Sequence, residues 1–189
     1  GPNNFILSQG GTNWLGDSDL ESALGISNSI NATVLEFDFI PITNKVSFDY
    51  IFSSEQYLIN ATANQCNYTD GFAFLLKPVD NSTPYQNLAI VPGTNIPVKI
   101  NTVRGSGSVC PPANQSFFDA FNGTNHPTNF NGQTVIMKAE ANVIPGTPFA
   151  YWVSDKVRGA FQKFDPFESD GRVVRQGLAT ADDFRFVRA

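Results

Sequence analysis

Four acidic residues stand where a strand or helix is expected to begin or end, and their carboxylates could bind a cation. Asp17 and Asp19 follow a glycine, Glu55 ends a predicted strand, and Asp70 directly precedes an apolar run. Carboxylates beside loops rich in Asn and backbone carbonyls suit the oxygen-seeking Ca²⁺ ion. We therefore predict a candidate calcium site, with Glu55 and Asp70 as its best ligands. The alternative is that these acids only cap turns and helices.

Acid–base or covalent catalysis finds little support in the chain. The one histidine, His126, stands before Pro127 in a polar loop. A lone loop histidine is more often a solvated side chain than a catalytic base. The sequence has no Gly-x-Ser-x-Gly motif, no phosphate-binding glycine loop and no histidine-based metal pattern. We predict that the protein is not an enzyme.

The two cysteines, Cys66 and Cys110, lie in polar, loop-like sequences. Because buried structural thiols usually sit in apolar runs, this context predicts a disulfide that joins two loops. Closing a loop of about 45 residues would stabilise the fold by roughly 3–4 kcal/mol. The alternative is two exposed free thiols, which an oxidising compartment tolerates poorly.

Six Asn-x-Ser/Thr sequons occur, where composition alone gives roughly three. They are at Asn31, Asn60, Asn67, Asn81, Asn114 and Asn122. If they carry N-linked glycans, these sites face solvent in an exported protein. The alternative is a chain that is merely rich in Asn and Thr.

Charge is sparse and uneven along the chain. Charged residues make up 15%, against a typical ~25%. Residues 1–155 carry 12 acids and 5 bases, a balance of −7, and residues 156–189 carry 5 acids and 7 bases, a balance of +2. The acidic first part argues against nucleic-acid binding, and no apolar run is long enough for a membrane helix. We therefore predict a domain over 1–155 and a C-terminal segment of uncertain origin over 156–189.

The elements that would position these residues are mostly strands. Alternating apolar and polar residues over 34–40 and 46–52, with a short Pro/Asn-rich connection, predict an antiparallel hairpin. Further strands are expected over residues 71–76, 88–91, 98–100, 134–141 and 149–153, and a short helix over 17–24 with Asp17 or Ser18 as its cap. The fold class is all-β, an antiparallel two-sheet β-sandwich with long loops, of which 101–132 is the longest.

Aromatic side chains near loops offer a second kind of chemistry. Trp14, Tyr57, Tyr68 and Trp152 could stack on sugar rings, although aromatic residues in a β protein more often lie in the core.

The order of motifs along residues 1–155 resembles the choice-of-anchor L domain family. The matching stretches are residues 1–3, 16–20, 32–39, 46–57, 70–74, 87–98 and 131–135, with a turn at 143–146. The resemblance implies an exported, surface-attached, β-rich protein without known catalysis. Family members begin upstream of Gly1, so the sandwich is expected to be incomplete at its N-terminus. They also carry a second Glu where Gln56 stands here, which weakens a metal site built on both carboxylates.

The last 30 residues resemble another family. Residues 164–172 and 176–186 are similar to a segment of bacterial restriction and phage-defence DNA methyltransferases. The cofactor-binding fold and the catalytic Asn-Pro-Pro-Tyr type of motif are absent from the chain, so this resemblance implies no methylation.

Two hypotheses follow for the function. The first is a non-enzymatic, extracellular protein with a structural or adhesive role at the cell surface. It could be a glycosylated subunit of an extracellular filament. Its partners would then be copies of itself or other cell-surface components. The alternative is a calcium-assisted carbohydrate-binding module. Neither involves nucleic acid or membrane insertion of this chain.

Overall fold

The computed structural model describes residues 15–122 and 130–156. Its larger sheet has the strand order β1-β9-β4-β5, and every pairing in it is antiparallel. The strands are β1 (Ala32–Phe39), β4 (Phe72–Pro78), β5 (Gln86–Asn87) and β9 (Phe149–Lys156). Within the described residues, β1 is an edge strand, because it pairs with β9 on one side only.

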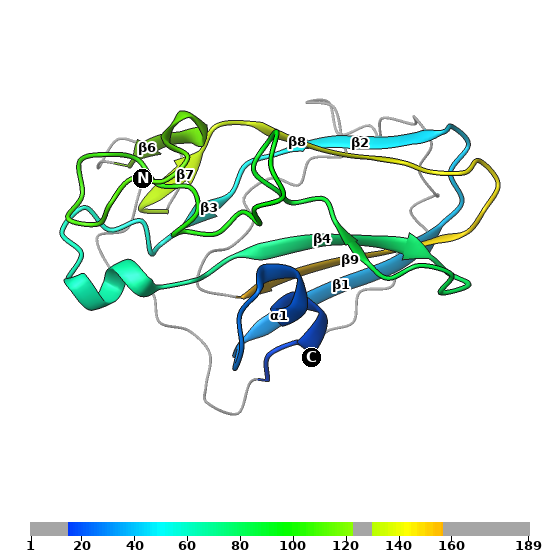
Figure 1. The fold of residues 1–189 in the computed structure, drawn as a ribbon, viewed down its shortest axis with the longest axis horizontal. Coiled ribbons are helices and arrows are strands. Elements are labelled where there is room, and N and C mark those ends of the chain that lie inside the picture. The colour runs from blue at the N-terminus through cyan, green and yellow to red at the C-terminus, as the bar shows by residue number, and fades with distance from the viewer. Residues whose placement is uncertain (1–14, 123–129, 157–189) are drawn as a thin grey trace.

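A second layer faces this sheet (Figure 1). It consists of β2 (Lys45–Tyr50) paired with β8 (Met137–Asn142), and of a smaller sheet in the order β3-β7-β6. The short strands are β3 (Ser53–Ser54), β6 (Phe118–Phe121) and β7 (Gly132–Thr134). The prediction of an all-β fold with antiparallel sheets is confirmed.

Aromatic side chains fill the space between the layers. The inward positions of β1 include Phe37 and Phe39, and those of β4 include Phe72 and Phe74. From the facing layer, Tyr50 meets Phe74 edge to face, with ring centroids 5.2 Å apart. Such edge contacts add about 0.5–1.5 kcal/mol per pair to the free energy from burial. The high phenylalanine content of the sequence therefore builds the core.

The predicted hairpin between residues 34–40 and 46–52 is wrong. β1 pairs with β9 and β2 pairs with β8, so the two strands belong to different layers. The connection over 40–44 carries the chain from one layer to the other (Figure 1). Both strands still direct their apolar side chains into the same core, so their alternation alone could not distinguish a hairpin from a crossing.

Four other expected elements also differ. Residues 88–91 and 98–100 contribute buried core side chains but form isolated bridges instead of regular strands. The expected strand over 134–141 divides into β7, which pairs with β3 and β6, and β8, which pairs with β2. The expected long loop over 101–132 contains η2 (Gln115–Phe117) and β6.

The predicted short helix is confirmed as α1 (Ser18–Leu24). Asp17 caps it, since its Oδ1 accepts hydrogen bonds from the backbone N–H groups of Asp19 and Leu20, each at 2.8 Å. Gly25 ends it in the left-handed region at φ 62°. Leu20 and Leu24 bury against β4, so α1 covers the outer face of the larger sheet (Figure 1).

The predicted disulfide is also confirmed. Cys66, in η1 (Ala63–Asn67), is bonded to Cys110, and the bridge spans a sequence separation of 44 residues. Arg104, only 5% exposed, donates from Nη2 to the carbonyl oxygen of Cys66 at 3.4 Å. The bridge therefore joins two loop segments beside a buried guanidinium.

Candidate functional site

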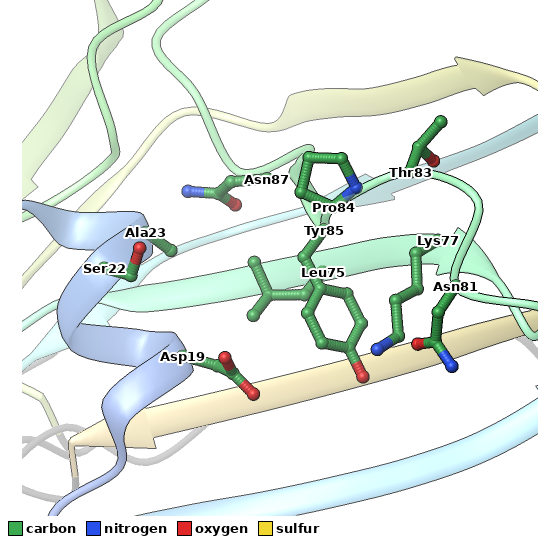
Figure 2. Close-up of a pocket in the computed structure, with 10 residues that line it drawn as sticks. All are labelled: Asp19, Ser22, Ala23, Leu75, Lys77, Asn81, Thr83, Pro84, Tyr85 and Asn87. Atoms are coloured by element: carbon green, nitrogen blue, oxygen red, sulfur yellow. The ribbon is translucent and has the colours of Figure 1, made fainter.

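A pocket of about 480 Å³ lies on the outer face of the larger sheet, between α1 and the loop that leads from β4 to β5. Figure 2 shows Asp19, Ser22 and Ala23 on the side of α1, and Lys77, Asn81 and Thr83 on the opposite side. The ring of Tyr85 stands between the two groups. The volume falls in the range of about 300–1,000 Å³ that small-molecule sites occupy.

The floor of the pocket follows from the alternation of side chains along β4. Phe72, Phe74 and Leu76 face the core between the layers. The intervening residues face outward, where Leu75 joins the apolar cluster under α1 and Lys77 extends along the pocket. The same strand therefore supplies the core on one face and the pocket on the other.

Tyr85 is half-buried and packs against the apolar cluster under α1. The ammonium group of Lys77 lies over its ring, 4.2 Å from the centroid, which is a cation–π contact. Sequence reasoning did not select Tyr85. The only signal was an aromatic residue directly after Pro84 in an otherwise polar loop.

Negative charges act on the hydroxyl of Tyr85. Burial raises the pKa of the Tyr85 phenol above its usual value, and nearby negative charges raise it further, in the order Glu36, Asp19, Asp38 and Asp17. The phenol therefore stays protonated at neutral pH, able to donate and to accept a hydrogen bond.

The register of the sheet explains how one of these acids, Asp38, comes near the pocket. Asp38 of β1 pairs with Ala150 of β9, and Ala150 pairs with Lys77 of β4. Asp38 and Lys77 thus stand in one row across the sheet, about 10 Å apart at the backbone, with a small alanine between them.

Asn87 contributes an amide to the pocket lining. Its Oδ1 accepts hydrogen bonds from the backbone N–H groups of Phe74 at 3.2 Å and Ala89 at 2.9 Å. Its Nδ2 is buried and has no hydrogen-bond partner. A buried donor without an acceptor costs about 1–3 kcal/mol, so this nitrogen favours an acceptor group nearby.

The four predicted calcium ligands do not form one cluster. Asp17 caps α1 and Asp19 lines the pocket, whereas Glu55 and Asp70 are each 3% exposed. No group of three or more His, Cys, Asp and Glu residues in the described parts of the chain is arranged to hold a metal. Calcium at a smaller set of these carboxylates stays a prediction.

The predicted sugar-stacking aromatics are not brought together. Tyr57 is 1% exposed, and its hydroxyl donates to the carbonyl oxygen of Val103 at 2.9 Å, so it belongs to the core. Tyr68 is 37% exposed, outside the pocket lining. Trp14 and the side chain of Trp152 lie outside what the structure describes, as does His126.

The six sequons divide by exposure. Asn60, Asn67 and Asn81 are exposed. Asn31 is 4% exposed, a placement with no room for a glycan. Asn114 and Asn122 are half-buried and use their Nδ2 groups as donors, to the carbonyl oxygens of Thr102 and Phe130 respectively, both at 2.7 Å. Glycosylation itself stays a prediction, and the exposed trio are its best sites.

The domain boundary near residue 155 stays a prediction, because the segment over 157–189 falls outside the described residues. Its resemblance to DNA methyltransferases therefore stays unverified. The described part of the chain has no helix of the length and apolar character needed to span a membrane.

Comparison with known families gives one match. The sequence model of the choice-of-anchor L domain matches residues 1–156. No curated protein and no solved structure matches the chain. The match covers both layers of the described fold.

Proposed function

The chain belongs to the choice-of-anchor L domain family, and from that premise we propose that it is a non-enzymatic structural or adhesive protein of the cell surface. The family places it among cell-surface or secreted proteins. The observation that carries the proposal is the disulfide between Cys66 and Cys110. Such bridges persist in oxidising compartments, outside the reducing cytosol.

Two exposed sequons support a glycosylated outer surface. Asn60 and Asn67 flank Cys66 closely in sequence, and both side chains are exposed. Glycans there would cover the loop that the disulfide ties down. A bridged and glycan-covered loop resists proteolysis, which suits a domain that stays outside the cell.

The edge strand β1 supports assembly of copies into a filament. Its eight residues pair with β9 on one side only within the described chain. A strand from another molecule can extend a sheet at such an edge through backbone hydrogen bonds, although the N–H of Ala32, at the start of β1, already donates to the carbonyl oxygen of Leu15 at 3.0 Å. Glu36 and Asp38, both exposed on β1, would restrict which partners are accepted.

Microscopy of the native material tests this function. Antibodies against the chain should label the outside of intact cells, and electron microscopy of released material should show filaments or surface layers. Label confined to the cytosol would contradict the cell-surface assignment. If antibodies label the cell surface but electron microscopy shows only dispersed monomers, the filament is contradicted and the adhesive role remains.

The second candidate, carbohydrate binding, is favoured by one observation, the pocket around Tyr85. Of the four predicted calcium ligands, Asp19 lines the pocket, whereas the two expected to be the best ligands, Glu55 and Asp70, are buried in the interior. Neither lines the pocket, so carbohydrate binding there needs no calcium from them.

A further inference from the structure

The geometry points to the pocket between α1 and the β4–β5 loop as a binding site for neutral carbohydrate, with Tyr85 as its aromatic platform. This inference rests on the second candidate function, carbohydrate binding at the same pocket, and adds the charge of the ligand and the residues that would hold it; it is independent of the surface role. It also differs from a calcium-assisted site, because the pocket lining includes only one of the predicted calcium ligands, Asp19.

The composition of the lining suits a sugar. The apolar part, Leu75 with the ring of Tyr85, can contact the C–H face of a pyranose. Around it stand groups that donate and accept hydrogen bonds with hydroxyls, namely Asp19, Ser22, Asn81, Thr83 and Asn87. Figure 2 shows these groups on both sides of the Tyr85 ring, so a ligand seated there would meet polar groups from α1 and from the loop together.

The local charge selects a neutral ligand. The carboxylates of Glu36, Asp19, Asp38 and Asp17 all act on Tyr85, so an anionic sugar or a phosphate would be repelled. A cationic ligand meets a different obstacle, the ammonium group of Lys77, which lies over one face of the Tyr85 ring; a sugar would contact the part of the ring that Lys77 leaves uncovered. A ligand that is uncharged and rich in hydroxyls avoids both costs.

The same sugar chemistry could come from two sources. One is a separate polysaccharide, and the other is a glycan attached to Asn81, the sequon asparagine in the pocket lining. An attached glycan would fill the pocket at high effective concentration. Protein produced in the oxidising periplasm of a bacterium without N-glycosylation, compared with protein from a eukaryotic secretory host, separates the two.

Titration of the full chain with three neutral probes, chitotriose, cellotriose and mannotriose, tests the inference by calorimetry and NMR. Trigalacturonate serves as the anionic probe and a lysine tripeptide as the cationic probe. We expect at least one neutral probe to bind the unglycosylated chain, equally well with and without EDTA. If the natural occupant of the pocket is the glycan attached to Asn81, that glycan competes with the probe. The glycosylated chain should then bind the same probe at least tenfold more weakly than the unglycosylated chain.

Two variants locate the site. Tyr85→Ala should weaken binding about tenfold by removing the platform. Ser22→Trp should block the pocket from an exposed helix position without changing its floor. Tyr68→Ala is the matched control, because Tyr68 is an exposed tyrosine outside the pocket, and its affinity should equal that of the wild type.

The inference is overturned if no neutral probe binds, if only the anionic or cationic probe binds, or if Ser22→Trp binds as well as Tyr68→Ala. Thermal melting of each variant separates loss of binding from loss of folding. None of these outcomes bears on whether the chain resides at the cell surface, so failure here and failure of the proposed function remain distinct.

Discussion

Two buried tyrosines in the core differ in whether the hydroxyl group has a hydrogen-bond partner. The hydroxyl of Tyr57 donates to the carbonyl oxygen of Val103 at 2.9 Å, whereas that of Tyr50 is buried without a partner. Both rings are at most 2% exposed. The pair therefore separates the contribution of a buried hydrogen bond from that of ring burial.

Replacing Tyr57 by Phe should lower the free energy of unfolding by about 1–2 kcal/mol, because the carbonyl oxygen of Val103 would lose its donor. Tyr50→Phe is the control, and it should be neutral or slightly stabilising, since it removes a hydroxyl that has no partner. Urea denaturation of both variants measures the difference. Equal losses in the two variants would contradict the assignment of these hydroxyls.

The same tyrosines predict a loss of stability in alkali. Burial raises the pKa of Tyr57, partly offset by Arg104, and burial also raises the pKa of Tyr50. An unfolded tyrosine ionises near pH 10, so their contribution is complete below that pH and is lost as the pH rises above it. Urea midpoints should therefore be flat from about pH 7 to pH 9 and fall above about pH 10. A midpoint that is unchanged at about pH 11 would contradict the burial of both phenols.

Residue types in the sequence were enough to predict the disulfide and a helix cap at Asp17 or Ser18, because both depend on local context. Tyr85 could not be predicted as a site residue. Its role depends on α1, on the outward face of β4 and on acids from β1, which the register of three strands brings together. Tyr57 was misread for the same reason, since only the fold shows that it lies inside.

At the scale of elements, alternation predicted where strands lie but not which strands pair. β1 and β2 both carry an apolar face, and both faces meet the same core from opposite layers. A hairpin and a crossing connection bury the same side chains. The pairing is decided by β8 and β9, which begin only at Met137 and Phe149 and whose register local periodicity cannot reveal.

α1 is the element whose local signals and tertiary contacts agree most fully. Asp17 accepts two backbone hydrogen bonds at its start, and Leu20 and Leu24 are at most 1% exposed against β4. Asp17→Ala should therefore lower the free energy of unfolding by about 1 kcal/mol. Asp19→Ala, in the exposed first turn, is the control and should lower the free energy of unfolding by only about 0.3 kcal/mol. Thermal melts of the two variants that coincide would contradict the capping role.

At the scale of the whole molecule, the disulfide restricts the unfolded chain more than any single contact. The bridge between Cys66 and Cys110 closes a separation of 44 residues. Replacing both cysteines by Ser should cost up to about 4 kcal/mol by loop entropy. Reduced wild-type protein is the control and should melt like the double variant. An unchanged urea midpoint in the double variant would show that the bridge does not stabilise the fold.

The central claim is that this chain works outside the cell as a bridged and glycan-bearing surface domain. Intact mass of native protein released from the cell surface, measured before and after reduction and after enzymatic deglycosylation, tests it most directly. We predict that reduction adds two hydrogens for the bridge between Cys66 and Cys110, and that deglycosylation removes sugar mass mapping to Asn60, Asn67 or Asn81. Native protein with both thiols free and no attached sugar would contradict the account.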